Sequence, residues 1–350
     1  MRRSLHFCCL LWVAWVWPGP NGHGESHERD SIKAGNHDPT VYIVDFQDKF
    51  YIKPLVTVRS LNLNFSDENG NIDDITYSAT TNAYLGLGVY LFDIGLELSF
   101  RLPNETQDPT TYGETDVLDF QTNIYGRKWG GDLAYQRYSG FFLERPGDHI
   151  TSWQRGEPYP QRQDLSMSNS QLNIFYIFNH NRFSYRSAFN QADMQTRSAG
   201  SFLLGLSTST FSFSADSTLI PRESRDAFAE DAIVSGARFT VLGLLPGYAH
   251  NFIYKQFYLN VSLSVGPAHL WTRYTTEDRE RNEIGIQPIL NLRSAIGYNS
   301  DSFFGGISVV NHAVSNQIDN LDIRGSSGNV KFFVGYRFRE KGFLTKSILQ

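Results

Sequence analysis

The stretch "GNVKFFVGYRF", residues 328–338, alternates between two unlike kinds of side chain. Val330, Phe332, Val334, Tyr336 and Phe338 share one parity, whereas lysine, phenylalanine, glycine and arginine occupy the positions between them. Successive side chains of an extended chain point to opposite sides, so the pattern predicts a strand with two unlike faces. A soluble sandwich would bury the apolar face against a second sheet, and a membrane barrel would turn it to lipid.

The same alternation recurs in other segments and favours the barrel. In "QFYLNVSLSVG" and "DIGLELSFR" the apolar parity is continuous, and the second segment places Glu97 and Arg101 on the polar face. Charges on an inner face are costly in a dry core and ordinary in a wet lumen. We therefore expect Val261 to face lipid and Ser262 to face the lumen, where an arginine would cost much less than at Val261.

Composition agrees with a barrel. Aromatic residues make up 14% of the chain, with 26 Phe and 18 Tyr, while the mean hydropathy is only −0.34. Past the amino terminus no stretch approaches the ~20 apolar residues of a spanning helix, and a barrel strand needs only every second residue to be apolar. The net charge of −5 argues against nucleic-acid binding.

The amino terminus resembles a secretory signal peptide, expected over residues 1–24. Arg2 and Arg3 precede an apolar run that a Pro/Gly segment ends, and an uncleaved anchor is the alternative. Cys8 and Cys9, the two cysteines of the chain, both lie in this segment. The exported chain would therefore lack disulfides, thiolate metal sites and a cysteine nucleophile.

Alternation and turn residues together predict one domain, a closed antiparallel up-and-down transmembrane β-barrel over residues 49–338. About fourteen strands are expected, near residues 50–65, 77–91, 94–102, 117–127, 131–143, 169–179, 182–192, 198–208, 210–220, 238–253, 256–274, 285–299, 302–315 and 328–338. The residues 198–220 could instead form one long strand, so a total of twelve strands is the alternative count.

Connections of unequal length separate these strands, with both termini on the side of the short turns. Long polar connections are expected around residues 66–76, 102–116, 144–167, 221–236, 275–284 and 316–328. In the first strand the apolar parity switches at Arg59, where we expect a β-bulge. Residues 25–48 form an expected N-terminal periplasmic segment, and residues 339–350 a short periplasmic tail.

Several blocks in one order carry a family resemblance. "FYIKPLVTVRSLNLNF", "GLGVYLFDIGLELSFRLP", "NIYGRKWGGDLAYQRYSGFF" and the closing "GNVKFFVGYRF" resemble the Bacteroidetes family called domain of unknown function 4421, over residues 45–338. The resemblance implies an exported bacterial protein with an outer-membrane barrel, and it implies no activity. The closing block also resembles the terminal strand signal recognised by the outer-membrane insertion machinery.

Two groups of residues are candidates for function. The expected lumen residues, which line an aqueous path or form a mutually paired plug, are Glu97, Arg101, Asp119, Gln121, Arg186, Asn190, Arg293 and Arg337. The expected membrane-interface and terminal-strand residues are Trp129, Phe332, Tyr336 and Phe338. No histidine pair has metal-ligand spacing and no phosphate loop follows a strand, so neither a metal nor a cofactor is expected.

One constellation could carry catalysis. His312, Ser315 and Asp319 lie together at the expected outer rim, which leaves an outer-membrane lipid-modifying hydrolase as the alternative function. Histidine and serine three residues apart point to opposite faces of a strand, so only a loop could join them. A secreted soluble β-sandwich is a third alternative.

The sequence thus predicts a monomeric, non-enzymatic barrel in the bacterial outer membrane. Its partners would be the lipid bilayer, the insertion machinery and a small solute, which the barrel passes or binds. A purely structural role, with exposed loops, is the alternative to passing or binding a solute.

Deleting residues 339–350 should leave folding and membrane insertion intact, because the expected terminal strand ends at Phe338. Phe338→Asp, or deletion from Val334 onward, should abolish assembly, since a strand edge would stay unpaired in the bilayer. Heat-modifiable migration on a gel and membrane fractionation measure both outcomes. Loss of insertion on deletion of the tail alone would place the terminal strand beyond Phe338.

Overall fold

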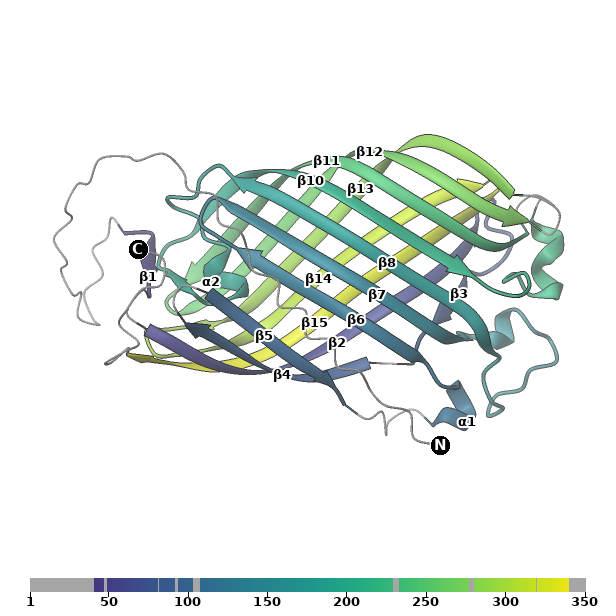
Figure 1. Cartoon of the computed structure of the whole chain (residues 1–350), viewed down its shortest axis with the longest axis horizontal. Helices are drawn as coiled ribbons and strands as arrows, with labels where there is room; N and C mark the ends of the chain where they lie inside the picture. Colours follow the sequence, from purple (N-terminus) through teal and green to yellow (C-terminus); the bar gives the residue numbers. More distant parts are fainter. Residues whose placement is uncertain are drawn as a thin grey trace, which may run out of the picture. The chain divides into compact units, whose positions relative to one another are not determined.

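The computed structural model describes residues 41–46, 49–80, 82–91, 94–102, 108–228, 233–276, 280–318 and 320–339, which form an antiparallel barrel (Figure 1). Ten strands close on themselves: β2 (Lys49–Asp67), β3 (Ile75–Ser78), β7 (Trp129–Leu143), β8 (Gln161–Ile177), β10 (Ala199–Ser214), β11 (Val234–Tyr254), β12 (Phe257–Thr276), β13 (Glu280–Asn299), β14 (Phe303–Ile318) and β15 (Leu321–Arg339). The all-β closed barrel is confirmed.

Three more strands are bonded outside this closed path. β4 (Asn82–Leu91) pairs with β2, β5 (Ile94–Arg101) pairs with β4, and β6 (Asp116–Tyr125) pairs with β7. The short elements are β1 (Ile43–Asp45), α1 (Pro109–Tyr112), η1 (Pro146–Asp148), α2 (Arg186–Phe189), β9 (Asp193–Gln195) and η2 (Arg222–Ala227). Within the described ranges, no helix has both the length and the apolar content needed to cross a membrane.

The outer surface of the barrel has two halves. We call the end with the β11–β12 and β13–β14 turns the turn end, and the end with α1, η1 and η2 the loop end (Figure 1). In the half next to the turn end, outward side chains are apolar and exposed, as for Leu259, Val261 and Leu263 at 37–45%. Side chains between them, such as Asn260 and Ser262, point inward and are buried. This half has the face pattern of a membrane barrel.

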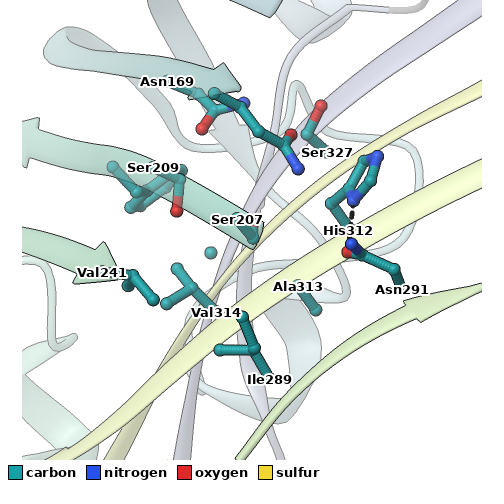
Figure 2. Close-up of a pocket in the computed structure, with 13 residues that line it drawn as sticks. Asn169, Ser207, Ser209, Val241, Ile289, Asn291, His312, Ala313, Val314 and Ser327 are labelled. Atoms are coloured by element: carbon teal, nitrogen blue, oxygen red, sulfur yellow. Dashed lines mark hydrogen bonds between the residues drawn. The ribbon is translucent and has the colours of Figure 1, made fainter. Parts of the chain in front are cut away.

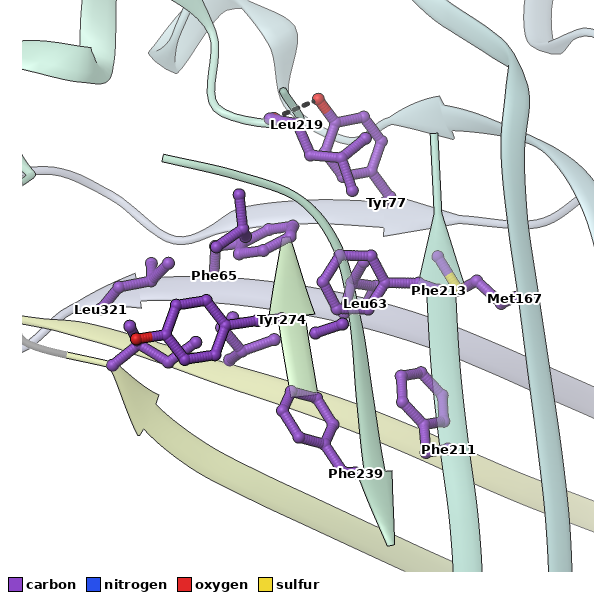
Figure 3. Close-up of a cluster of buried hydrophobic side chains, with 14 of the residues drawn as sticks. Leu63, Phe65, Tyr77, Met167, Phe211, Phe213, Leu219, Phe239, Tyr274 and Leu321 are labelled. Atoms are coloured by element: carbon purple, nitrogen blue, oxygen red, sulfur yellow. Dashed lines mark hydrogen bonds between the residues drawn. The ribbon is translucent and has the colours of Figure 1, made fainter. Parts of the chain in front are cut away.

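In the half next to the loop end, apolar side chains point inward and polar side chains point outward. On β12, Leu270 and Tyr274 are buried inside, whereas Arg273 and Thr275 are exposed on the outer surface. A cluster of buried apolar side chains fills the lumen here, with members from all ten closed strands and from the β10–β11 connection (Figure 3). This half is built like a soluble β-barrel, with a dry core and a polar exterior.

Contacts across this core join opposite walls. The ring of Phe65 on β2 lies 5.8 Å, between centroids, from the ring of Phe213 on β10 (Figure 3). Phe211 on β10 packs so closely against Gly325 on β15 that a Cβ at that glycine would lie 2.6 Å from the ring. The lumen is therefore filled with side chains at this level.

The expected bulge at Arg59 is wrong. Pairing of β2 with β15 keeps one register from Asp67 to Lys49, and Arg59 lies opposite Asn329 without a shift. The strand passes straight from one half of the barrel to the other, so the side that must be apolar changes while the backbone does not. Leu61 and Leu63 are buried inside, whereas Ile52 and Val56 are exposed outside.

The expected count of fourteen strands is not confirmed, and some individual strands differ. The expected strands at 198–208 and 210–220 are one strand, β10, and the expected strand at 77–91 is divided into β3 and β4. The expected strand at 182–192 is wrong, because these residues form α2 and part of an insertion inside the barrel. The expected long connections near 275–284 and 316–328 are mostly strand, since β12 to β15 extend into the soluble-like half.

Ser262 faces the inside of the barrel as expected, but its surroundings there are packed. Val261 is exposed outside and Ser262 is buried inside, as the alternation predicts. The hydroxyl of Ser262, however, hydrogen bonds to the hydroxyl of buried Tyr185. An arginine at Ser262 would meet packed side chains instead of an open lumen, so we expect it to cost more than the alternation alone predicts.

Gly325→Val should destabilise the barrel by ~1–3 kcal/mol, because the new side chain would overlap the packed ring of Phe211. Gly285→Val is the matched control, since no described residue lies within 4 Å of a Cβ at Gly285. Urea unfolding in detergent or vesicles measures both. Equal stability of the two variants would contradict a filled lumen at the loop end.

Candidate functional site

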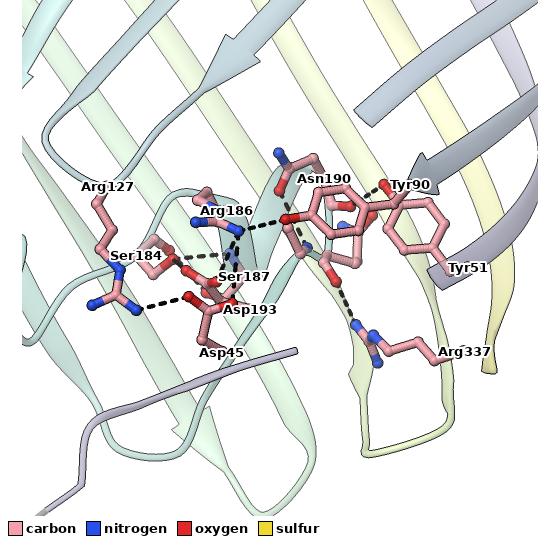
Figure 4. Close-up of polar contacts among 12 residues, drawn as sticks. Asp45, Tyr51, Tyr90, Arg127, Ser184, Arg186, Ser187, Asn190, Asp193 and Arg337 are labelled. Carbon is pink, nitrogen blue, oxygen red and sulfur yellow. Dashed lines mark hydrogen bonds and ion pairs between the residues drawn. The ribbon is translucent and has the colours of Figure 1, made fainter. Parts of the chain in front are cut away.

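The connection between β8 and β10 folds back into the turn end of the lumen. Residues 178–198, which we call the insertion, contain α2 and β9, and Figure 4 shows their polar contacts with the wall. Phe183, Tyr185 and Phe189 are buried in one cluster with wall residues. β9 also pairs with β1, three residues that lie in the expected N-terminal periplasmic segment. The insertion therefore occupies the turn end of the lumen.

Wall side chains hold the backbone of the insertion. The Tyr51 hydroxyl donates to the Asn190 carbonyl oxygen at 2.6 Å, and the Arg337 guanidinium donates to the Gln191 carbonyl oxygen at 2.6 Å (Figure 4). Asn299 donates to two further carbonyl oxygens, both at 3.0 Å. Gln191 has a φ of 58°, a left-handed conformation that non-glycine residues rarely adopt. Such a conformation persists where surrounding contacts hold it.

Arg186 is the charged centre of the insertion. Its guanidinium donates to the Tyr90 hydroxyl at 2.8 Å and lies 3.4 Å from the Asp193 carboxylate (Figure 4). Burial raises the pKa of Asp193, and the positive charge of Arg186 opposes this shift. Asp45 on β1 forms an ion pair with Arg127 at 2.9 Å, which links β1 to the turn after β6. Charge pairing thus joins the insertion, β1 and the barrel.

A layer of polar contacts lies in the lumen between the insertion and the apolar core. Asp119 on β6 accepts hydrogen bonds from Arg59 at 3.0 Å, Gln136 at 3.0 Å and Tyr138 at 2.6 Å. Asp132 on β7 forms an ion pair with Arg293 on β13, and both side chains are buried. The pair of Asp132 and Arg293 crosses the lumen, because β7 and β13 are far apart in the strand order, so paired polar groups bridge its middle.

A small cavity of about 30 Å³ lies where the polar layer meets the apolar core (Figure 2). His312 faces it, and its Nδ1 lies 2.6 Å from Asn291 Oδ1. Ser315 is three residues along the same strand, β14, and so points to the other face. Asp319 lies outside the described residues. The structure therefore does not bring His312 and Ser315 together, and the expected catalytic set is not assembled.

A larger cavity of about 80 Å³ lies above the insertion, between the wall strands β2, β5, β6, β14 and β15. Charged groups converge at its side: Lys53 lies 2.6 Å from Glu97, Lys331 pairs with the same carboxylate, and Arg59 pairs with Asp119. We call these five residues the charged cluster. Lys53 is fully buried and also donates to Gln191 of the insertion at 3.2 Å. Three cations against two carboxylates leave the charged cluster with a net positive charge.

The wall beside this cavity contains an unpaired place. Among the residues that the structure describes, β5 pairs with β4 and β6 pairs with β7, and no ladder joins β5 to β6. We call this place the seam. The outward side chains on its two sides are very exposed, with Leu98 at 69%, Phe100 at 76% and Ile124 at 72%. Arg101 donates to the Thr115 carbonyl oxygen at 3.3 Å, which links the two sides at the loop end of β5.

The expected lumen residues are divided between the polar layer, the seam and the insertion. Glu97, Asp119 and Gln121 lie near the larger cavity, Arg101 lies at the seam, and Arg186 and Asn190 belong to the insertion. Arg293 and Arg337 are buried in paired contacts. That any of them lines a path for a solute stays a prediction.

Sequence analysis missed Lys53, Arg59 and Asp132 as inward polar groups. Lys53 could have been recognised as an inward residue from the alternation, since it shares the parity of Tyr51 and Leu55, which both point inward. Of the expected interface residues, Trp129 is 57% exposed, and Phe332, Tyr336 and Phe338 are 41–49% exposed. Their role at a membrane interface stays a prediction.

The fold and the filled lumen define the class of protein: a closed β-barrel with an apolar outer band. The chain belongs to the family described as "Domain of unknown function (DUF4421)", whose model matches residues 29–338. No curated protein matches the chain.

The chain is weakly similar to several solved structures. The outer-membrane protease OmpT of Escherichia coli is 10% identical over 84% of this chain and 98% of its own, with a TM-score of 0.38. The attachment invasion locus protein Ail of Yersinia pestis is 11% identical over 61% of this chain and 100% of its own, with a TM-score of 0.24. A FadL homologue of Pseudomonas aeruginosa is 10% identical over 83% of this chain and 90% of its own, with a TM-score of 0.26.

Glu97→Ala should destabilise the barrel by about 2–3 kcal/mol, because Lys53 and Lys331 would lose their shared counter-ion. Lys331→Met is the matched control, since it leaves Lys53 paired with Glu97. It should cost less than half as much in urea unfolding. An equal loss in the two variants would show that the carboxylate does not hold both cations.

Proposed function

We propose that this protein is a monomeric, non-enzymatic barrel of the bacterial outer membrane that binds a small amphipathic solute entering from the bilayer through the seam. The band of exposed Leu, Ile, Val and Phe side chains in the half next to the turn end supports the membrane location, since water would not stabilise such a surface. The loop end would then face outward and the turn end the periplasm.

The filled lumen argues for binding over axial passage. The insertion occupies the turn end, bonded polar groups bridge the middle, and the apolar cluster fills the loop end. A solute moving along the axis would have to displace all three layers. The larger cavity instead lies beside the seam, and that is the observation on which the proposal rests.

The chemistry on the two sides of the seam matches an amphipathic molecule. A polar headgroup with acceptor oxygens would enter the cavity of about 80 Å³ beside Arg59 and the two lysines. Arg59 Nε is buried without a hydrogen-bond partner among the described residues, so a donor is available there. The apolar tail would stay outside against Leu98 and Phe100, while the unpaired backbone edges meet the polar part.

Export follows from the same proposal. A signal peptide over residues 1–24 would direct the chain across the inner membrane, and the outer-membrane insertion machinery would recognise the strand that ends at Phe338. A bacterial origin in the Bacteroidetes agrees with the resemblance stated above. No contact of the described residues favours a lipid-modifying hydrolase, since His312 and Ser315 lie on opposite faces of β14.

Ser99→Trp should fill the cavity and weaken binding of a dansyl-labelled fatty acid by about tenfold or more, because Ser99 lines the cavity. Leu206→Trp is the matched control, since Leu206 on β10 is exposed on the outer surface away from the seam and should leave binding unchanged. Dansyl fluorescence with the purified barrel in phosphatidylcholine vesicles measures both. Equal binding by the two variants, or stepwise conductance of the wild type in a planar bilayer, would contradict the proposal.

A further inference from the structure

Outward polar side chains form a row across five neighbouring strands, just beyond the apolar band. Direct strand pairing places Arg137 on β7 opposite Ser168 on β8, Ser168 opposite Ser212 on β10, Ser212 opposite Arg238 on β11, and Arg238 opposite Arg273 on β12. We call these five residues the arginine row. At about 4.8 Å per strand spacing, Arg137 and Arg238 are roughly 14 Å apart.

The arginine row borders a shallow depression of the outer surface. The depression is also lined by Ser166, Ser214, Thr275 and Glu280. Ser168 Oγ and Ser212 Oγ lie 2.8 Å apart at its centre. The surface therefore offers guanidinium groups at its sides and hydroxyl groups between them, and Glu280 is the acidic residue among its lining residues.

Two of the three arginines have no side-chain partner among the residues that the structure describes. Within the part of the chain that the structure describes, Arg137 and Arg238 have neither a hydrogen bond nor an ion pair from their side chains. Arg273 is different, because it donates to Asn282 at 3.1 Å and lies 3.3 Å from Glu280. Two exposed cations thus lie on either side of the serine pair without a counter-ion among the described residues.

The arginine row lies next to the aromatic edge of the apolar band. Two residues nearer the turn end on the same strands, the outward side chains are Tyr135 and Trp271, at 43% and 39% exposure. The next outward residues include Leu133 and Leu242, each 45% exposed. Tyrosine and tryptophan favour the boundary between hydrocarbon and headgroups, so the arginine row would lie at the level of the headgroups.

We infer that the arginine row binds the phosphate of an anionic lipid headgroup in the leaflet next to the loop end. Guanidinium groups pair with phosphate oxygens through charge-assisted hydrogen bonds, and serine hydroxyls can donate to the same oxygens. The lipid would act as the missing counter-ion of Arg137 and Arg238. This inference rests on the membrane location given under the proposed function, and it does not depend on the seam or on its solute.

Native mass spectrometry of the purified barrel in a neutral detergent tests the inference, with phosphatidylglycerol and phosphatidylcholine as competing probes. The wild type should retain phosphatidylglycerol in preference. Arg137→Gln with Arg238→Gln should reduce that preference by roughly thirtyfold, since each arginine near an anionic surface contributes a factor of about five. Inorganic phosphate at the same concentration should not displace the lipid, because it lacks the tail that keeps the headgroup at this level.

Arg324→Gln is the matched control, because Arg324 is exposed on β15, outside the arginine row, and pairs with Asp322 at 3.2 Å. It should leave the lipid preference unchanged. Heat-modifiable migration of each variant shows separately whether the barrel is folded. A folded double variant that keeps the preference, or equal loss in Arg324→Gln, would overturn the inference. A chain that needs no detergent would instead contradict the membrane location.

Discussion

The structure depends on one continuous wall whose outer surroundings change along its length. β2 and β15 pair in one register through both halves, so the backbone of these strands does not follow the change. Side chains follow it instead: apolar groups point outward next to the turn end and inward next to the loop end. Where the outer surface faces hydrocarbon, the lumen can be polar; where it faces water, the barrel needs an apolar core inside. The polar layer of the lumen lies between these two parts of the barrel.

Most of the fold was predictable because the membrane half has the strongest alternation. The strand that ends at Phe338 was recognised from residue 328, whereas β15 begins at Leu321. Its first residues carry Leu321 and Ile323 inward and Asp322 and Arg324 outward, so their parity opposes that of the membrane half. Such a stretch reads as a polar loop. The same reason explains the bulge that was wrongly expected at Arg59.

The insertion could not have been predicted from periodicity. In "RFSYRSAFNQ" the aromatic residues share one parity, which predicts a strand, yet Phe183, Tyr185 and Phe189 are buried inside the lumen. Local pattern does not distinguish an aromatic stripe facing lipid from one packed against the inner wall. The inner charges were partly recognised, as with Glu97 and Asp119. Their partners Lys53 and Arg59 lie far away in the sequence and depend on barrel closure.

The central claim is that outward residues of one strand leave hydrocarbon and enter water between Val265 and Arg273 of β12. Nitroxide spin labels at alternate outward positions from Phe257 to Thr275, in phosphatidylcholine vesicles, measure this directly through collisions with oxygen and with a water-soluble nickel chelate. The account predicts high oxygen and low nickel accessibility from Leu259 to Val265, and the reverse at Arg273 and Thr275. Uniform nickel accessibility along the whole strand would contradict it.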